Sequence, residues 1–287
     1  MMHKTFKLLL FVYFLTIICF SGSAQQHFYM SFTGGIAGYK GDLGSTNIIN
    51  INGMMGIGAV VELNHRMLIR GEMNYGKISG SDQFSLSNRS RNLSFSSKIT
   101  EFSLLFEYVL FDLYEYKVSP YLFAGIGTFK FSPFTKDREG NTVMLAELAT
   151  EGQGFYMDRK DYKLNKLAIP FGGGMQWALS DKVRLALETG IRKTNTDYID
   201  DVSTTYVDPI LLEQKKGGTS VKLAYRGDEL PNSKPYPAAD TKRGNPDNKD
   251  WYIFSGASLR ISLQPRGRDW TDRFPVRRAK TKCPTIF

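Results

Sequence analysis

The sequence predicts an all-β protein, an eight-stranded antiparallel transmembrane β-barrel with long outer loops and a periplasmic C-terminal tail. Three observations support this prediction. A short apolar segment near the start has the form of a secretory signal. Eight later segments alternate between apolar and polar residues, or are rich in aromatic and β-branched residues, as strands are. The connections between these segments alternate between long and short, which is typical of outer-membrane barrels.

The first of these observations concerns export. Lys4 and Lys7 precede an apolar run from Leu8 to Phe20, and small residues follow as far as Ala24. That order is typical of a cleavable signal peptide, which we expect to cover residues 1–24. The run is shorter than the roughly 20 residues that a membrane-spanning helix needs, and no later apolar stretch is longer. Any membrane form of the chain must therefore be a barrel.

The eight expected strands are each about 10 to 15 residues long, enough to cross a bilayer at a tilt. They cover residues 28–40, 54–64, 66–78, 98–110, 119–131, 166–179, 182–196 and 251–264. In the last of them, Ile253, Leu259 and Ile261 share one apolar face, since alternate residues of a strand point the same way. The opposite face is mostly small or polar, and Phe254 is an exception to it.

Loop lengths decide between a soluble sandwich and a membrane barrel, because alternation alone fits both. The connections after the odd-numbered strands are roughly 13, 19, 34 and 54 residues long, and those after the even-numbered strands roughly 1, 8 and 2. We therefore expect a barrel over residues 25–264 with its apolar face toward lipid. Short helices are expected at 143–150 and after the N-cap Asp208, and a hairpin over 142–158 would instead give ten strands.

Charged residues on the other face are expected to fill the barrel interior. Five acids and four bases nearly cancel there: Glu62, Arg70, Glu72, Glu101, Glu107, Arg184, Glu188, Arg192 and Arg260. Because an eight-stranded barrel is only wide enough for side chains to fill, we expect a structural ionic plug with negligible conductance. A gated channel lining is the alternative.

Residues for catalysis or metal binding are not grouped in the sequence. His3 lies in the signal, His27 at the expected mature start and His65 in a tight turn, so we expect no enzyme activity, no metal and no cofactor. The glycines at 172–174 lie within a strand, where they favour curvature and bulges.

An acidic cluster opens the longest outer loop, at Asp197, Asp200, Asp201 and Asp208. Calcium prefers oxygen ligands, but this spacing fits no calcium-loop template. A solvated or arginine-paired cluster is favoured.

The C-terminal segment 265–287 is basic, with seven Arg or Lys against two Asp in a chain of formal charge +9. Strand parity places it in the periplasm, where nucleic acid is not expected. Trp270 and Phe274, with Arg277 and Arg278, are typical of a docking peptide, and an unstructured extension is the alternative. Cys283 would be the single cysteine of the mature chain, so it pairs with another chain or stays a free thiol.

Several segments resemble the PorG family of Bacteroidetes outer-membrane barrels. They are residues 38–43 (GYKGDL), 91–95 (RNLSF), 120–127 (PYLFAGIG), 169–172 (IPFG), 190–194 (GIRKT), 196–198 (TDY), 200–208 (DDVSTTYVD) and 243–246 (RGNP) before Trp251. The resemblance covers nearly the whole expected mature chain.

The resemblance implies a non-enzymatic structural part of the type IX protein secretion machinery, located in the outer membrane. It implies anchoring of a periplasmic ring formed by the lipoprotein PorK and its partner PorN, with Cys283 tied to the lipoprotein. Whether this member serves secretion or gliding motility is left open by the sequence. An adhesin or surface receptor that uses the long outer loops is the alternative function, and a small diffusion channel is a third.

Overall fold

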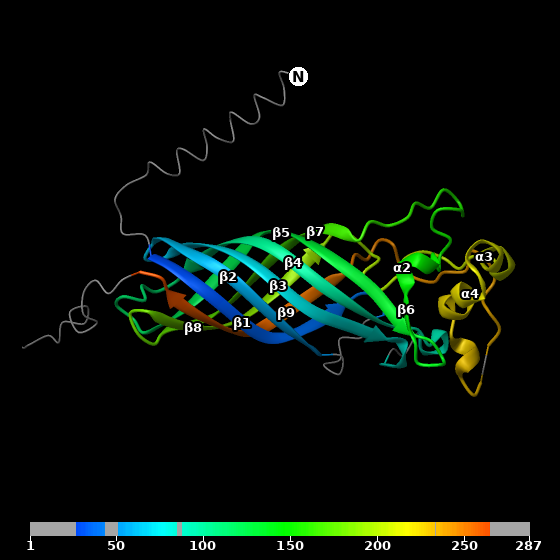
Figure 1. Cartoon of the computed structure of the whole chain (residues 1–287), viewed down its shortest axis with the longest axis horizontal. Helices are drawn as coiled ribbons and strands as arrows, with labels where there is room; N and C mark the ends of the chain where they lie inside the picture. Colours follow the sequence, from blue (N-terminus) through cyan, green and yellow to red (C-terminus); the bar gives the residue numbers. More distant parts are fainter. Residues whose placement is uncertain (1–26, 44–50, 85–87, 233, 265–287) are drawn as a thin grey trace, which may run out of the picture.

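The computed structural model describes residues 27–43, 51–84, 88–232 and 234–264 (Figure 1). The expected signal at 1–24 lies outside the described residues, and so does the tail 265–287. Predictions for Trp270, Phe274, Arg277, Arg278 and Cys283 therefore remain predictions.

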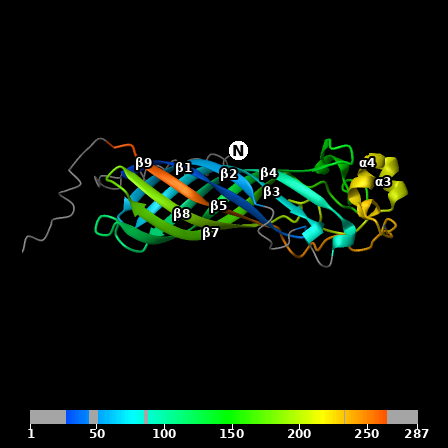
Figure 2. The same ribbon diagram turned by 90° about the horizontal axis from the view of Figure 1, so that it is seen from below.

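The described chain forms a closed antiparallel barrel. Its eight strands are β1 (His27–Lys40), β2 (Asn52–Asn64), β3 (Met67–Ser81), β4 (Ser94–Val109), β5 (Val118–Lys136), β7 (Asn165–Ala178), β8 (Val183–Thr194) and β9 (Trp251–Ser262). Each strand pairs with its neighbours along the chain, and pairing of β1 with β9 closes the ring. The eight-stranded antiparallel fold predicted from the sequence is confirmed. Figure 2 shows the strands winding around the barrel at a tilt.

Alternation along each strand separates an apolar outer face from a largely polar inner face. On β4, the outward-facing Phe102 and Leu104 are each 54% exposed, whereas the neighbouring Glu101 and Glu107 are completely buried. This distribution reverses that of a soluble protein, in which charged side chains face water and large apolar ones face the core. The prediction that the apolar face points outward is confirmed.

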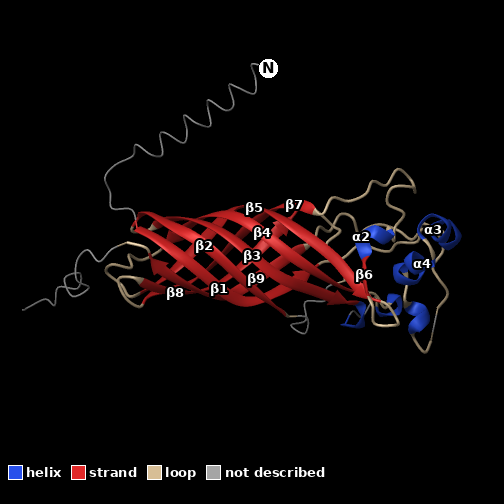
Figure 3. Ribbon diagram, viewed as in Figure 1, coloured by secondary structure: helices blue, strands red, loops and turns tan. Residues whose placement is uncertain are grey.

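The long connections gather at one end of the barrel and carry the remaining elements (Figures 1 and 3). These are the short strand β6 (Thr142–Met144), the helices α2 (Leu145–Leu148), α3 (Pro209–Lys216) and α4 (Gly218–Ala224), and the 3₁₀ turns η2 (Asp82–Phe84), η3 (Arg89–Arg91) and η4 (Gly227–Glu229). No helix in the described ranges is both long and apolar enough to cross a membrane.

The helix predicted after Asp208 is confirmed, because the Asp208 carboxylate accepts hydrogen bonds from the backbone N–H groups of Ile210 and Leu211 at 2.9 and 3.0 Å. The expected helix over 143–150 is shorter, at four residues. The alternative of a hairpin at 142–158 is wrong. There β6 pairs with the end of β5 over only three residues, outside the barrel wall.

The glycines at 172–174 act by allowing close approach of backbones. A Cβ atom added to Gly172 would lie 2.2 Å from the Thr189 carbonyl oxygen, and one added to Gly174 would lie 2.1 Å from the Leu187 carbonyl oxygen. The pairing of β7 with β8 keeps continuous register, so the expected bulge is absent from this pair of strands. Any larger residue would push the two strands apart.

Candidate functional site

The nine charged side chains predicted for the interior all lie inside the barrel. They form a central group and two flanking groups, and Glu72, which pairs with both Arg70 and Arg192, joins the central group to the one toward the long loops. In the central group, Arg70 donates two hydrogen bonds to Glu188, at 2.7 and 3.1 Å. Arg70 Nε also lies 3.0 Å from Glu107 Oε1 and 3.2 Å from Glu72 Oε2. Arg260 donates two hydrogen bonds to Glu107, at 2.7 and 3.0 Å. The Tyr121 hydroxyl donates to Glu188, so this centre is cross-linked across the barrel.

The two flanking groups use tyrosines in the same way. Toward the short turns, Arg184 pairs with Glu62 at 2.9 Å and stacks on the Tyr29 ring at 4.5 Å. Toward the long loops, Arg192 pairs with Glu101 at 3.3 Å, and the Tyr252 hydroxyl donates to the same carboxylate at 2.5 Å. Ion pairs that each have further hydrogen-bond partners can repay the cost of removing charges from water.

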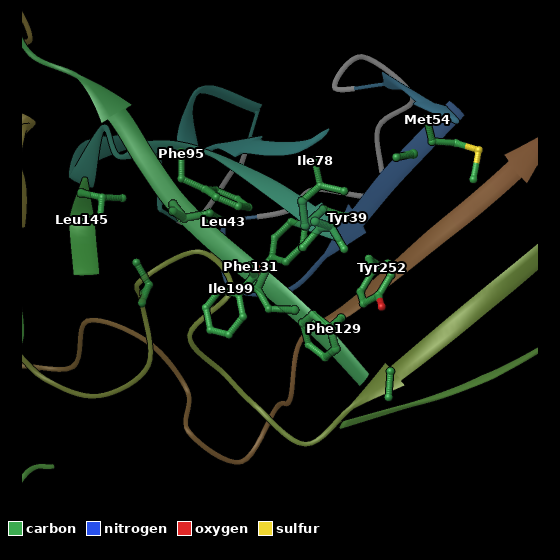
Figure 4. Close-up of a cluster of buried hydrophobic side chains, with 14 of the residues drawn as sticks. Tyr39, Leu43, Met54, Ile78, Phe95, Phe129, Phe131, Leu145, Ile199 and Tyr252 are labelled. Atoms are coloured by element: carbon green, nitrogen blue, oxygen red, sulfur yellow. The ribbon is translucent and has the colours of Figure 1, made fainter. Parts of the chain in front are cut away.

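An aromatic layer, which the sequence reasoning missed, fills the barrel beyond Arg192. Phe129, Phe131 and Tyr252 are each at most 1% exposed, and Phe254 is 3% exposed. The four rings belong to one buried cluster with side chains from the long loops, Leu43, Leu145 and Ile199 among them. Figure 4 labels Phe129, Phe131 and Tyr252 together with these three loop residues. The ionic plug therefore fills only part of the interior. The sequence offered one sign of this aromatic layer, which is Phe254, the apolar exception on the polar face of its strand.

The ionic groups and the aromatic layer occupy the interior at several levels, and this bears on the permeability of the barrel. We expect the purified chain in a planar bilayer to show no resolved conductance steps, because charged and aromatic side chains link opposite strands at several levels of a narrow interior. A single-channel recording measures this directly. Stable openings carrying current of porin size would contradict the prediction, and a barrel denatured by heat before insertion serves as the control.

The four long connections pack together into a cap, here called the loop cap, formed by residues 41–43, 82–93, 137–164 and 195–250 as far as they are described. Arg243 holds it together. Its guanidinium donates to Glu151 Oε1 at 2.9 Å, to the Asp201 carbonyl at 2.6 Å and to the Ala224 carbonyl at 3.2 Å. Glu151 in turn accepts hydrogen bonds from the backbone N–H groups of Ser203 and Thr204, both at 2.9 Å.

A second arginine ties the other two loops to this centre. Arg91 makes two hydrogen bonds of 2.7 Å with Asp82 and donates to the carbonyl oxygens of Asp42 and Arg243. Four segments singled out in the sequence, 38–43, 91–95, 200–208 and 243–246, therefore meet in one network of contacts. What these segments build together is a closed cap over a filled barrel.

Three members of the acidic cluster, Asp197, Asp200 and Asp201, are buried, whereas Asp208 is exposed where it caps α3. The expectation that the cluster is solvated is therefore wrong for Asp200 and Asp201. The Tyr39 hydroxyl lies 2.7 Å from Asp200 Oδ2 and 2.6 Å from Asp250 Oδ1. One hydroxyl can donate to only one of them, so the other contact requires a proton on a carboxyl. Asp201 accepts hydrogen bonds from Thr150 and Tyr162, at 2.5 and 2.6 Å.

Burial raises the pKa of these loop carboxyls. It raises the pKa of Asp197 to about 8 and the pKa values of Asp200 and Asp201 each to about 7. Burial, and next the charge of Asp200, raise the pKa of Asp250 well above its usual value. The nearby Arg243 opposes the shift at Asp201, but burial is the larger effect.

These shifts make the loop cap less stable at higher pH. A carboxyl whose pKa is higher in the folded state than its unfolded value, near 4, contributes its full stability below pH 4 and loses it as pH rises through the folded pKa. From pH 5 to pH 8, we expect the free energy of opening the cap to fall by about 2 kcal/mol per carboxyl. Amide hydrogen exchange of residues 195–207 measures it. Asp201→Asn should reduce the dependence, whereas protection that rises with pH would contradict the prediction.

A cleft of about 470 Å³ opens in the outer surface of the loop cap. Tyr206, Tyr225 and Tyr236 line it, with ring centroids 5.6 to 6.0 Å apart in edge-to-face contact. Lys234 and Lys242 stand at the same cleft. Among the described residues, no group of three or more His, Cys, Asp or Glu side chains could hold a metal ion.

The closed eight-stranded ring, its apolar outer face and its charged interior define an outer-membrane type of β-barrel. The sequence matches the family described as "Domain of unknown function (DUF6089)" over residues 6–209, and the chain belongs to that family. A search of curated proteins found no match.

The chain also resembles solved outer-membrane proteins, at low sequence identity. Neisserial surface protein A is 13% identical, with a TM-score of 0.42, over 82% of this chain and 97% of that one. A major outer membrane protein of Thermus thermophilus is 14% identical, with a TM-score of 0.41, over 84% and 100%. Ail, the attachment invasion locus protein of Yersinia pestis, is 11% identical, with a TM-score of 0.39, over 83% and 100%. The fold assigned here rests on the strand pairing of this chain.

Proposed function

We propose that this chain is a non-enzymatic structural component of the type IX protein secretion machinery. It spans the outer membrane as a sealed barrel and anchors the periplasmic PorK and PorN ring through residues 265–287. The observation that carries the proposal is the ionic network and aromatic layer inside the barrel beneath the loop cap, because side chains that link opposite strands make a rigid body suited to anchoring. The resemblance to the PorG family supplies the identity of the machinery.

The tail gives this proposal its test. We expect non-reducing gels of membranes to show a cross-linked species that contains this chain and the lipoprotein, and Cys283→Ser to remove it. The physical reason is that a periplasmic cysteine without a partner in its own chain can form a disulfide with another chain, and such a bond persists in an oxidising compartment. Truncation after Gln264 should release the ring from the outer membrane while the barrel still inserts. Absence of any cross-linked species in the wild type would contradict the covalent tether.

The aromatic cleft of the loop cap favours a second candidate, a surface receptor or adhesin. Three tyrosine rings beside Lys234 and Lys242 can stack on a flat ligand and pair with an acidic group. On this alternative, Tyr236→Ala with Lys242→Gln abolishes function, whereas removal of residues 265–287 does not. Secretion that fails on loss of the tail but survives the cleft substitutions would exclude the receptor.

A further inference from the structure

Charged residues are sorted between the two faces of the barrel wall. All five acids and all four arginines of the eight barrel strands belong to the buried interior network. The exposed charged side chains of these strands are all lysines: Lys40, Lys77, Lys98, Lys130, Lys136 and Lys193. Each lies within the part of its strand nearest the long loops. On the outer face, the eight strands therefore present positive charge at one height and no acidic side chain, because their five acids all face inward.

Three of these lysines form a patch on neighbouring strands. Lys77 on β3 is the direct cross-strand partner of Lys98 on β4. Lys98 pairs with Ser132 on β5, so Lys130 lies two residues further along β5 on the same face. Side chains opposite each other across strands have Cβ atoms roughly 5 Å apart, and like charges there are destabilising. Within the described residues, no carboxylate pairs with any of the three; Lys77 Nζ lies 5.8 Å from the Phe134 ring.

An apolar groove of about 600 Å³ runs across the same strands, on the side of the patch away from the long loops. Outward-facing side chains line it, among them Met73, Phe102, Ile126 and Leu167. Gly71 leaves it open, because nothing lies within 4 Å of the place where a Cβ would be. Met73 pairs with Phe102 just as Lys77 pairs with Lys98. Four residues along a strand separate the two pairs, which is about 13 Å.

The lysine patch and the apolar groove beside it together fit one kind of ligand. A cationic group followed by an exposed apolar groove matches a molecule with an anionic head and a hydrocarbon chain. A soluble anion would leave the groove empty, and a neutral lipid would leave the repulsion between Lys77 and Lys98 uncompensated. Phosphate satisfies several ammonium groups at once, because its oxygens accept hydrogen bonds from each of them.

A second pair of lysines at the same height lacks these features and provides a comparison. Lys40 and Lys193 are both register partners of Trp251 on β9. Their ammonium groups lie 5.9 and 5.7 Å from the Trp251 ring centroid, so the indole already serves both cations. No groove residue comes from β1, β8 or β9.

We propose that the outer wall over β3, β4 and β5 binds a lipid whose headgroup carries phosphate, with the phosphate at Lys77, Lys98 and Lys130 and an acyl chain in the groove at Gly71. The proposal rests on the membrane embedding contained in the proposed function. It is independent of the tail and of the partners that the tail binds. The site selects the lipid by its negative headgroup and holds it against one side of the barrel.

Native mass spectrometry of the full chain in detergent tests the proposal, with dimyristoyl phosphatidic acid as the probe. Dimyristoyl phosphatidylcholine and inorganic phosphate are the two comparisons. We expect the wild type to bind phosphatidic acid at least about tenfold more tightly than phosphatidylcholine, since each basic residue contributes about 1 kcal/mol toward an anionic lipid. Inorganic phosphate should not displace the bound lipid, because it cannot fill the groove.

Two matched pairs of variants locate the site. Lys77→Gln with Lys98→Gln should weaken binding of phosphatidic acid by about tenfold or more, whereas Lys40→Gln with Lys193→Gln changes it less than about twofold. Gly71→Leu should weaken it severalfold by filling the groove. Gly34→Leu should not, although a Cβ at Gly34 would likewise have nothing within 4 Å.

Equal losses from the two lysine pairs would overturn the proposal, because they would show that any exposed lysine on the barrel wall attracts the anionic lipid equally. Equal binding of the two lipids, or displacement by inorganic phosphate, would overturn it as well. In each of these cases the barrel still requires detergent and the proposed anchoring function stands. A chain that stays soluble and monomeric without detergent would instead defeat both proposals.

Discussion

Arg70→Met is expected to lower the free energy of unfolding of the barrel by about 3 to 5 kcal/mol, the usual cost of removing one partner from a buried ion-pair network. Arg70 is completely buried, and it is the residue that joins Glu72, Glu107 and Glu188. Methionine fills a similar volume but leaves Glu188 with the Tyr121 hydroxyl and an Arg260 nitrogen at 3.9 Å. The interior then holds five acids against three bases.

Urea unfolding of the barrel in lipid vesicles, followed by tryptophan fluorescence, measures this loss. Arg70→Met with Glu188→Gln removes the uncompensated carboxylate, so the double variant should be more stable than Arg70→Met alone. Arg138→Met is the matched control, because Arg138 pairs with Asp228 and Glu229 at an exposed site, and little change in the midpoint is expected there. Equal midpoints for Arg70→Met and the wild type would show that the network does not hold the barrel together.

The sequence was sufficient for the barrel because its signals are local. Alternation with a period of two reports which face each side chain occupies, and it does so residue by residue along β4 and β9. The Asp208 cap is local as well, since acceptor and donors are two and three residues apart. Helix α4 was missed because Gly217 and Gly218 resemble the end of a helix, and here a second helix begins at once.

Partners distant in the sequence could not be predicted. Asp201 is bonded to Thr150 and Tyr162, and Asp200 to Tyr39 of the first strand. Nothing near these aspartates in the sequence shows that hydroxyl groups from another loop and from the first strand will surround them. The sequence therefore predicted a solvated acidic cluster. In the structure these aspartates are buried in the loop cap, and tyrosine and threonine hydroxyls, instead of water, donate hydrogen bonds to them.

The loop cap should fail locally when its central cation is removed. Arg243→Met leaves Glu151 buried and unpaired, and it leaves the carbonyl oxygens of Asp201 and Ala224 without donors. We expect the free energy of opening the cap to fall by about 3 to 5 kcal/mol, while the barrel strands remain folded. Limited proteolysis of the folded chain in detergent should then cut within residues 195–250 at least about a hundredfold faster.

Neighbouring substitutions separate this effect from a general loosening of the loop. Lys242→Met changes the exposed adjacent cation and should leave the cleavage rate nearly unchanged. Arg243→Met with Glu151→Gln removes the buried charge while keeping an acceptor for the Ser203 and Thr204 N–H groups, and should recover part of the loss. Cleavage of Arg243→Met at the wild-type rate would contradict this prediction. The loops would then be held by the aromatic layer beneath them, because the loop residues Leu43, Leu145 and Ile199 pack in the same buried cluster as the aromatic rings.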